Sequence, residues 1–535
     1  MELKKKPTKK DNFVFLFKGS PLNDFLYPFK KAANQWVARY IIVTFAIIIR
    51  CAVGLGSYSG ENQPPNFGDF EYNRHYMEIV TSLPLYQWYL QDLGNSNFML
   101  KFPPLYAYHS FIWGIIGKLI NKSWFELNNS IGCQDIDLKS FMRITVLFSE
   151  LIAYIPSVII YTRWMGRHYN KAPSIDQTII AATILFLPDL AIIDHGHFQY
   201  NSFLLGIALI ALNNLLYDNL ALASIFFTLS ICFNPMILYY SPIFFFYLLS
   251  LCFVPKFNLI RLIYIGVSVL LTFIVIFLPF IYSGGIQLLS HILYTTFPLN
   301  FNILHQSYPN FWSMTNHLLN NNIDLSNLKN LSIILTILAI SPSCYAIFTN
   351  TSKRLLPWCL ASCSLSFFLF SFLIDETSVL LPWMPVTLLL NEVDADVISM
   401  ICWFFNTCLF SLMPLLKKDG LLLQYFVLGV LSNWLMGNLS WVRKFVNIII
   451  PFISQRPNAT PVLPHSYSWT ATIISFYVTA TIILSCDLLQ IQPLVEIENF
   501  WEISNTFLST ISFGIFYVWL NFKIYTIHSL KAKSD

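Results

Sequence analysis

Residues 260–282 read IRLIYIGVSVLLTFIVIFLPFIY, an apolar stretch of 23 residues in which Arg261 is the single charged side chain. A helix needs about 20 apolar residues to cross the hydrocarbon core of a bilayer. Comparable stretches recur along the 535 residues, of which 56% are hydrophobic and 11% are charged. A soluble domain carries about 25% charged residues. The sequence therefore predicts an all-α polytopic membrane protein.

Outward from this stretch, the apolar runs predict a single membrane domain over residues 1–535, with about 14 transmembrane helices. Three longer polar segments interrupt the runs, at residues 57–102, 283–328 and 451–468. The candidate spans lie at residues 40–56, 104–120, 142–161, 177–193, 199–216, 220–234, 236–254, 260–282, 330–349, 356–373, 378–390, 397–416, 421–437, 468–488 and 505–527.

The basic residues predict how the chain crosses the membrane. Residues 57–102 hold only Arg74 and Lys101 as basic residues, whereas five lysines lie within the first ten residues: Lys4, Lys5, Lys6, Lys9 and Lys10. Because cytoplasmic segments are enriched in Lys and Arg, we expect a cytosolic N-terminus and a lumenal first loop at residues 57–102. Lys531 and Lys533 match the dilysine retrieval signal of endoplasmic reticulum membrane proteins, which would make the C-terminus cytosolic too. An ordinary basic tail is the alternative interpretation.

Simple alternation of the candidate spans leaves one conflict. Arg163, Arg167 and Lys171 would then lie in the lumen, against the positive-inside rule. Either the number of spans before them is wrong, or the rule is overridden there.

Composition gives no support to two classes of function. The net charge of +4 does not suggest a nucleic-acid partner. The ten cysteines are scattered, most of them within apolar runs, and their spacing matches no zinc site. The sequence shows neither an internal repeat nor a separate soluble domain.

The residues at 68–75, Gly-Asp-Phe-Glu-Tyr-Asn-Arg-His, are the first candidates for chemistry. In an extended loop the side chains of Asp69 and Glu71 would point the same way, whereas on a helix they would diverge. A carboxylate near an apolar surface can accept a proton from a hydroxyl group. The alternative is a structural role, in which an acidic residue pairs with Arg74 to hold the loop.

The same loop also contains a helical pattern. Its polar side holds Asn73, Arg74 and Glu78, and its apolar side holds Tyr72, Tyr76, Ile79, Val80 and Leu83. This pattern predicts an amphipathic helix that lies in the membrane interface within the first lumenal loop.

Three further polar motifs border the apolar runs. His109 could bind a polar headgroup, or it could be a helix-face histidine with a backbone partner. The run Asp194-His195-Gly196-His197-Phe198-Gln199-Tyr200-Asn201 could ligate a metal ion, or it could form a polar plug whose hydrogen bonds satisfy a helix break. Asp375 and Glu376 lie between adjacent apolar spans, either as a site at a membrane face or as a short solvated loop.

Together these motifs resemble one known family, the dolichyl-phosphate-glucose-dependent α-1,3-glucosyltransferases of the endoplasmic reticulum. Gly196 and the residues at 107–110 favour the branch that adds the first glucose. The resembling segments run nearly end to end: Asp24-Phe25-Leu26-Tyr27-Pro28-Phe29, Asn34-Gln35-Trp36, Gly68-Asp69-Phe70-Glu71, Arg74-His75, Pro103-Pro104-Leu105, Ala107-Tyr108-His109-Ser110, Phe141-Met142-Arg143, the run from Asp194 to Asn201, Asn310-Phe311-Trp312 and Leu415-Leu416-Lys417-Lys418-Asp419-Gly420-Leu421.

The resemblance implies a multi-pass glycosyltransferase of the GT-C type in the endoplasmic reticulum membrane. Such an enzyme moves glucose from dolichyl-phosphate-glucose to a dolichyl-diphosphate-linked oligosaccharide, with inversion and without a cofactor. Asp69 would then be the catalytic base for the acceptor hydroxyl. We expect substrate binding by the remaining polar candidates and assign no residue to a metal; these candidates are Glu71, Arg74, His75, His109, Asp194, His195, His197, Gln199 and Glu376.

The chain also departs from the family pattern at polar positions. The departures lie at Lys101, at Asn234-Pro235, at Phe301, Asn302, His305, Gln306 and Ser307, and at Asp375-Glu376-Thr377. One alternative is therefore a catalytically impaired relative that binds lipid-linked sugar or a partner enzyme, and another is a site retuned around Lys101 or His305. A transporter is a third class, suggested only by many spans that carry polar residues.

Overall fold

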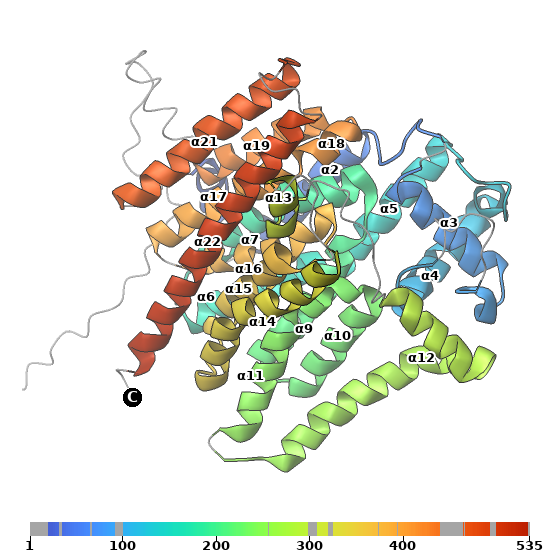
Figure 1. The fold of residues 1–535 in the computed structure, drawn as a ribbon, viewed down its shortest axis with the longest axis horizontal. Helices are drawn as coiled ribbons and strands as arrows, with labels where there is room; N and C mark the ends of the chain where they lie inside the picture. The colour runs from blue at the N-terminus through green and yellow to red at the C-terminus, as the bar shows by residue number, and fades with distance from the viewer. Residues whose placement is uncertain are drawn as a thin grey trace, which may run out of the picture.

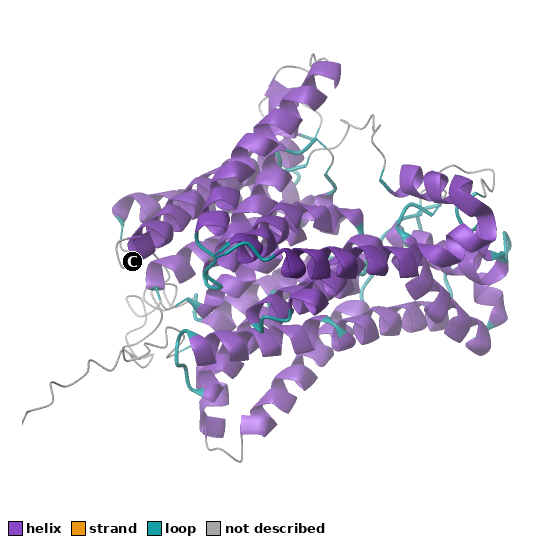
Figure 2. Cartoon of the chain, turned by 90° about the horizontal axis from the view of Figure 1, so that it is seen from below, coloured by secondary structure: helices purple, strands orange, loops and turns teal. Residues whose placement is uncertain are grey.

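The computed structural model describes residues 20–30, 35–64, 67–90, 100–254, 256–297, 308–318, 325–372, 374–392, 394–438, 464, 466–492 and 499–532. Every regular element in these ranges is a helix, and none of them contains a strand (Figure 1). The view from below shows the same all-helical architecture (Figure 2). The prediction of an all-α protein is confirmed.

Eight helical segments of the described residues are long and apolar enough to cross a membrane. They are α2 (Gln35–Gly54), α5 with α6 (Ile136–Ile152 and Tyr154–His168), η7 with α11 (Pro235–Tyr240 and Ser241–Phe253), α12 (Leu259–Thr296), α14 (Leu325–Thr349), α17 with α18 (Ala395–Ser411 and Met413–Lys418), α21 (Tyr467–Leu488) and α22 (Phe500–Ala532). Shorter apolar helices are α9 (Asn201–Leu216), α10 (Leu220–Phe233), α15 (Leu355–Phe370) and α19 (Leu422–Met436). The figure of about 14 crossings stays a prediction.

A ninth candidate span is broken in its middle. Helices α7 (Ser174–Leu185) and α8 (Pro188–Ile192) meet at an angle of 45°, measured with α8 extended to Phe198. Pro188 begins the second half, because a proline lacks the amide hydrogen that would continue the first half. The chain then widens into a π-helical turn, η6 (Ile193–Phe198). The polar motif that begins at Asp194 therefore occupies a break between membrane helices.

Helix α4 (Pro104–Ile120) has the bounds predicted for the second span, but it runs alongside α3 (Asp69–Ser82). The Tyr106 hydroxyl donates to Asn73 near the start of both helices, and Lys118 Nζ donates to Ser82 Oγ at 2.8 Å near their ends. Residues 104–120 are not among the described segments that are long and apolar enough to cross a membrane, so their crossing stays a prediction. The length and polarity of a sequence segment alone do not distinguish a membrane-spanning helix from a helix that packs against a neighbour such as α3.

This arrangement removes the conflict over the basic residues. Arg39, at the start of α2, donates to Ser174 Oγ at 3.2 Å, just beyond the end of α6. Arg163 and Arg167 lie close enough to act electrostatically on Arg39. The basic end of α6 thus lies on the same side of the molecule as the start of α2, as the positive-inside rule requires.

The second polar segment, residues 283–328, is largely helical where it is described. Helix α12 continues to Thr296 through a kink at Gly285, whose φ of 70° favours glycine. Helix α13 (Phe311–Leu318) follows, and α14 begins at Leu325. The departures at residues 301–307 and most of the third polar segment, 451–463, lie outside the described residues.

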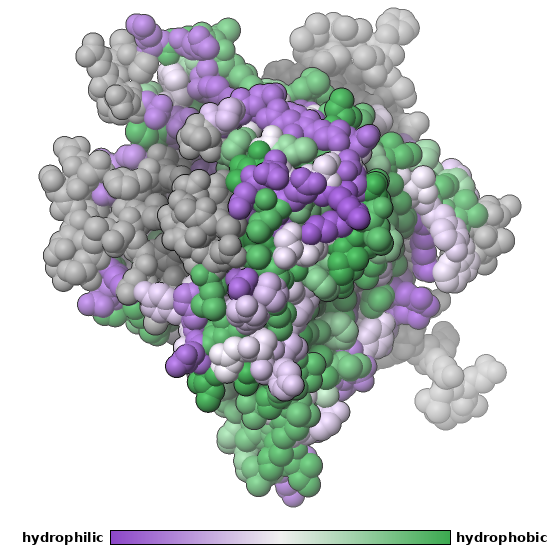
Figure 3. All heavy atoms as spheres, turned by 90° about the vertical axis from the view of Figure 1, so that its right-hand side faces the viewer, coloured by the Kyte–Doolittle hydropathy of each residue, from purple (hydrophilic) through white to green (hydrophobic). Residues whose placement is uncertain are grey.

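The molecular surface is divided by polarity. On the face shown in Figure 3, hydrophilic side chains gather in the upper part and hydrophobic ones dominate the lower tip. Helix α12 contributes exposed apolar side chains such as Ile260, Ile263 and Val275, as expected for a surface in contact with lipid.

Candidate active site

Asp69 is the first residue of α3. Gly68 precedes it with an extended backbone, and the Asp69 amide donates to Ser59 Oγ at 3.2 Å. Of the two arrangements considered for Asp69 and Glu71, extended or helical, the helical one applies. Residues two apart on a helix point in different directions, so these two carboxylates serve different surroundings.

The Asp69 carboxylate meets residues from distant parts of the chain. His197 Nε2 lies 3.1 Å from Asp69 Oδ2, and the Gln199 side-chain amide donates to the same oxygen. His197 Nδ1 lies 2.5 Å from Asp419 Oδ2. The Asp69 side chain keeps 35% of its surface exposed, whereas His197 and Asp419 keep 7% each. Asp69 is therefore the member of this cluster that a substrate can reach.

The hydrogen bonds define the charge of the cluster. Burial alone would raise the pKa of Asp69, but its hydrogen bonds with His197 and Gln199 outweigh burial and hold that pKa below its ordinary value. Lys101 lowers it further. Both ring nitrogens of His197 face carboxylate oxygens, and a histidine can donate from both only as imidazolium. Asp69 is thus ionised at neutral pH and stands beside a positive charge.

Hydrogen bonds to backbone groups connect residues 57–59, Arg143 and residues 196–199. Arg143 Nη2 donates to the Gly196 carbonyl at 2.7 Å and to the Ser57 carbonyl at 3.1 Å. The Ser59 amide donates to the His197 carbonyl at 3.1 Å. Phe198 has a φ of 91°, a conformation uncommon for a bulky residue, and it turns the chain between His197 and Gln199. Both side chains thereby reach Asp69.

Asp375 and Glu376 face the same cluster. Burial raises the pKa of Asp375, and the nearby Asp69 raises it further. Burial also raises the pKa of Glu376 to about 7, while Lys418 opposes the rise. Asp375 thus lies within electrostatic reach of Asp69 and His197, and Glu376 lies within reach of His197 and Asp419. Lys101 and Lys418 are exposed and act on Asp69 and on Glu376, respectively.

Three predicted substrate-binding residues, Glu71, Arg74 and His75, belong to a different cluster. The fully buried Arg74 is 2.6 Å from Glu71 Oε1 and 2.8 Å from Glu78 Oε2. Arg74 also donates to the Trp124 carbonyl at 3.0 Å. These contacts hold residues 122–132 against α3. They agree with the alternative in which an acidic residue pairs with Arg74 to hold the loop. The helix predicted after Asp69 exists, but its polar side is buried in protein and does not face an interface.

His109, Asp194 and His195 likewise lie in packing contacts. His109 Nε2 is 2.9 Å from Ser149 Oγ, and its ring stacks on Phe203. His195 Nε2 is 2.8 Å from Glu150 Oε2, which Arg50 also holds. Asp194 accepts from the amides at the start of α9, including Asn201 at 3.2 Å. These bonds satisfy the helix break, as the polar-plug interpretation predicts.

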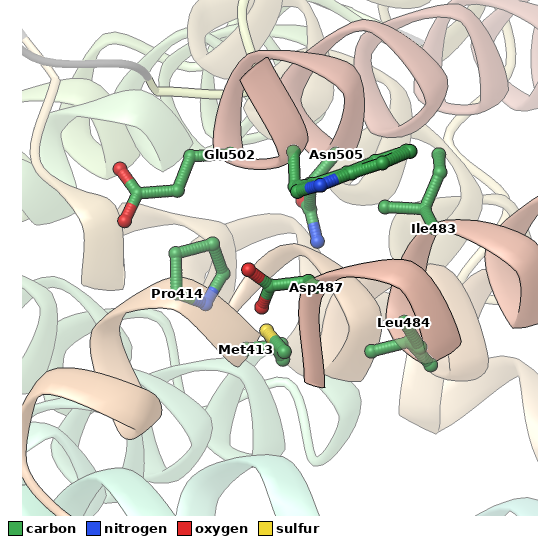
Figure 4. Close-up of a pocket in the computed structure, with 8 residues that line it drawn as sticks. Met413, Pro414, Ile483, Leu484, Asp487, Glu502 and Asn505 are labelled. Carbon is green, nitrogen blue, oxygen red and sulfur yellow. The ribbon is translucent and has the colours of Figure 1, made fainter. Parts of the chain in front are cut away.

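The structure thus brings His197 and Gln199 into contact with Asp69 and places Glu376 within electrostatic reach of His197. It adds three residues that the sequence analysis did not include among the catalytic or substrate-binding residues: Asp375, Lys418 and Asp419. In the sequence, the polar run Lys417-Lys418-Asp419-Gly420 between two apolar helices could have pointed to Asp419 as a site residue. The described ranges contain no group of three or more His, Cys, Asp or Glu side chains arranged to hold a metal ion. A separate pocket between α18, α21 and α22, lined by Asp487, Glu502 and Asn505 among others, contains none of the predicted site residues (Figure 4).

An ionised carboxylate beside a charged imidazole and open to substrate is an arrangement that suits acid–base chemistry, and it occurs here in a chain whose described helices can span a membrane. The chain belongs to the ALG6, ALG8 glycosyltransferase family, whose sequence profile matches residues 46–522. This membership confirms the predicted family and the predicted class, a multi-pass membrane glycosyltransferase of the GT-C type.

Individual relatives cover almost the whole chain. The chain is 42% identical over 530 residues to the dolichyl pyrophosphate Man9GlcNAc2 alpha-1,3-glucosyltransferase of Saccharomyces cerevisiae, with 97% of each chain covered. It is 37% identical over 504 residues to the probable enzyme of the same name from Schizosaccharomyces pombe, with 94% of each chain covered. It is 39% identical over 401 residues to the enzyme of the same name from Gallus gallus, with 74% of this chain and 77% of the relative covered.

Proposed function

We propose that this protein transfers glucose from dolichyl-phosphate-glucose to dolichyl-diphosphate-linked Man9GlcNAc2, forming an α-1,3 linkage with inversion. The proposal includes an endoplasmic reticulum location with both termini cytosolic and the site in the lumen. The single observation that carries it is the substrate-accessible Asp69 carboxylate beside His197. The names of the relatives supply the acceptor and the linkage, and the resemblance to the family supplies the donor.

The chemistry needs one base and one leaving group. Asp69 takes the proton of the acceptor hydroxyl while that oxygen bonds to C1 of the glucose. The bond between C1 and the phosphate oxygen breaks, and its electron pair leaves with dolichyl phosphate. A single in-line displacement of this kind inverts the anomeric centre. His197 and Gln199 hold the Asp69 oxygen in place during the transfer.

The positive groups of the site suit lipid phosphates. Lys101 acts electrostatically on Asp69 and Lys418 acts on Glu376, and both lysines are exposed, so their ammonium groups can attract phosphate. Because burial raises the pKa of Asp375 and of Glu376, these carboxyl groups carry less of the negative charge that would repel a phosphorylated donor. The retained Asp69 and these cations favour a working enzyme over a catalytically impaired relative.

Complementation tests the proposal. Yeast cells that lack the enzyme for the first glucose, when they express this chain, should regain glucosylated lipid-linked oligosaccharide. Asp69→Asn should fail to restore it at equal expression. Asp218→Asn is the matched control, because Asp218 is 70% exposed and pairs with Lys353 at the surface. Absence of glucosylation with well-expressed wild-type chain would contradict the proposal, and robust rescue would exclude the impaired relative.

A further inference from the structure

We propose that Asp419 is a positioning residue that keeps His197 charged and directed at Asp69. The inference rests on the proposed function, because Asp69 must be the base for the effect to appear in the rate of glucose transfer. It is based on two contacts of the His197 ring: Nε2 lies 3.1 Å from Asp69 Oδ2, and Nδ1 lies 2.5 Å from Asp419 Oδ2.

Asp419 is fixed by the end of helix α18. The Gly420 amide donates to the Lys417 carbonyl at 3.2 Å, and the Leu421 amide donates to the Leu416 carbonyl at 2.8 Å. Gly420 has a φ of 72°, the left-handed conformation that closes a helix in this way. The Ser57 hydroxyl donates to the Asp419 carbonyl. The backbone therefore presents the Asp419 carboxylate to His197 in one orientation.

The charge of His197 depends on having a carboxylate at each ring nitrogen. A neutral imidazole donates from one nitrogen only, so it cannot satisfy Asp69 and Asp419 together. If Asp419 loses its charge, the ring can give up one proton and remain bonded to Asp69. Asp69 then loses the positive charge that lies 3.1 Å away and becomes a carboxyl group that is easier to protonate.

Other charged and polar groups also face this cluster. They are Tyr72 and Tyr76 on α3, Lys101 ahead of α4, Tyr106 on α4, Arg143 on α5, Gln199 ahead of α9, Asp375 and Glu376 at η8 (Glu376–Val379), and Lys418 at the end of α18. Among the residues described by the structure, Asp69 and Asp419 are the two carboxylates within 4 Å of the His197 ring nitrogens. The effect of Asp419 should therefore pass through His197.

The test is the pH dependence of glucose transfer by purified full-length protein, with kcat and KM measured for wild type and variants. Asp419→Asn should move the acid limb upward by roughly 1–3 pH units, the effect expected of a lost neighbouring charge, and so lower kcat on the acid side of the profile. The KM for the acceptor should stay within about twofold, because Asp419 is not a substrate contact. Asp419→Glu, which keeps the charge, should leave the acid limb near that of wild type.

Two comparisons make the test decisive. In a His197→Gln background, Asp419→Asn should cause no further shift of the acid limb. The single variant Asp487→Asn is the control and should keep the acid limb of wild type, because Asp487 pairs with Lys417 at 2.8 Å. An unmoved acid limb in Asp419→Asn, or an added shift in the His197→Gln background, would overturn the inference. If Asp419→Asn does not fold, an unmoved limb in His197→Gln alone overturns it. Absence of transfer by wild-type protein would instead be the failure of the proposed function.

Discussion

Glu78→Gln is the substitution that best tests the buried charges beneath α3. The Glu78 side chain is fully buried, and its Oε2 lies 2.8 Å from Arg74 Nη2 and 3.1 Å from His75 Nδ1. Its Oε1 accepts from the Asn128 amide at 2.8 Å. Glutamine has nearly the same shape but removes the charge, so Arg74 loses one of its two carboxylate partners. We expect the loop at 122–132 to loosen and the folded protein to lose stability.

The magnitude follows from the pKa of Glu78. Burial alone would raise this pKa, but His75 and Arg74 outweigh it and lower the pKa from 4.5 to about 2. That difference corresponds to about 3 kcal/mol of stabilisation of the folded state at neutral pH. With an unfolding entropy of about 2 cal/mol/K per residue, the melting temperature should fall by about 3 °C.

The assay is thermal unfolding of the purified protein in detergent at several pH values. Because the folded-state pKa is lowered, the stabilisation is present above pH 4.5 and is lost as the pH falls towards 2. The gap between wild type and Glu78→Gln should therefore narrow below pH 4.5. Glu61→Gln is the control, since its pair with Lys139 is partly exposed and worth at most about 1 kcal/mol. Equal melting of Glu78→Gln and Glu61→Gln at pH 7 would refute the reasoning.

Two further substitutions test the site and the core. Gly68→Ala should reduce glucose transfer on the order of 10²-fold, because an added Cβ would overlap Ser59 Oγ and displace Asp69, whereas Gly266→Ala has no neighbour within 4 Å and should leave the rate unchanged. Equal rates for the two variants would contradict this account of Gly68. Arg50→Ala should destabilise the protein by about 3–5 kcal/mol, because the buried Glu150 then loses its arginine partner. Thermal unfolding measures this loss, with the surface variant Lys353→Ala as the control. A melting temperature no lower than that of Lys353→Ala would argue against this role for Arg50.

The positions of the helices could be predicted from the sequence because apolar runs report directly on burial in lipid or protein. The run at 468–488 became α21, and the run at 220–234 became α10. The sequence could not tell that residues 104–120 pack beside α3, since both a crossing and a covering helix need an apolar side. That fact depends on contacts such as Tyr106 with Asn73.

The site was only partly predictable for a similar reason. The resemblance to the family points to Asp69, whereas the local sequence leaves open whether Glu71 lies on the same side as Asp69 or turns away from it. The backbone at Gly68 starts a helix, which turns Glu71 towards Arg74. The contact of His197 with Asp419 joins residues 222 apart in sequence, so only the folded chain shows it.

The most direct test of the central claim, that Asp69 is the base of a glucosyltransferase, is the transfer rate of the purified protein. Dolichyl-phosphate-glucose and dolichyl-diphosphate-linked Man9GlcNAc2 are supplied, and the initial rate of glucose transfer is compared for wild type and Asp69→Asn. We predict transfer by wild type and a loss of roughly 10²–10⁴-fold in the variant, the usual contribution of a general base. A rate for Asp69→Asn equal to that of wild type would contradict the account.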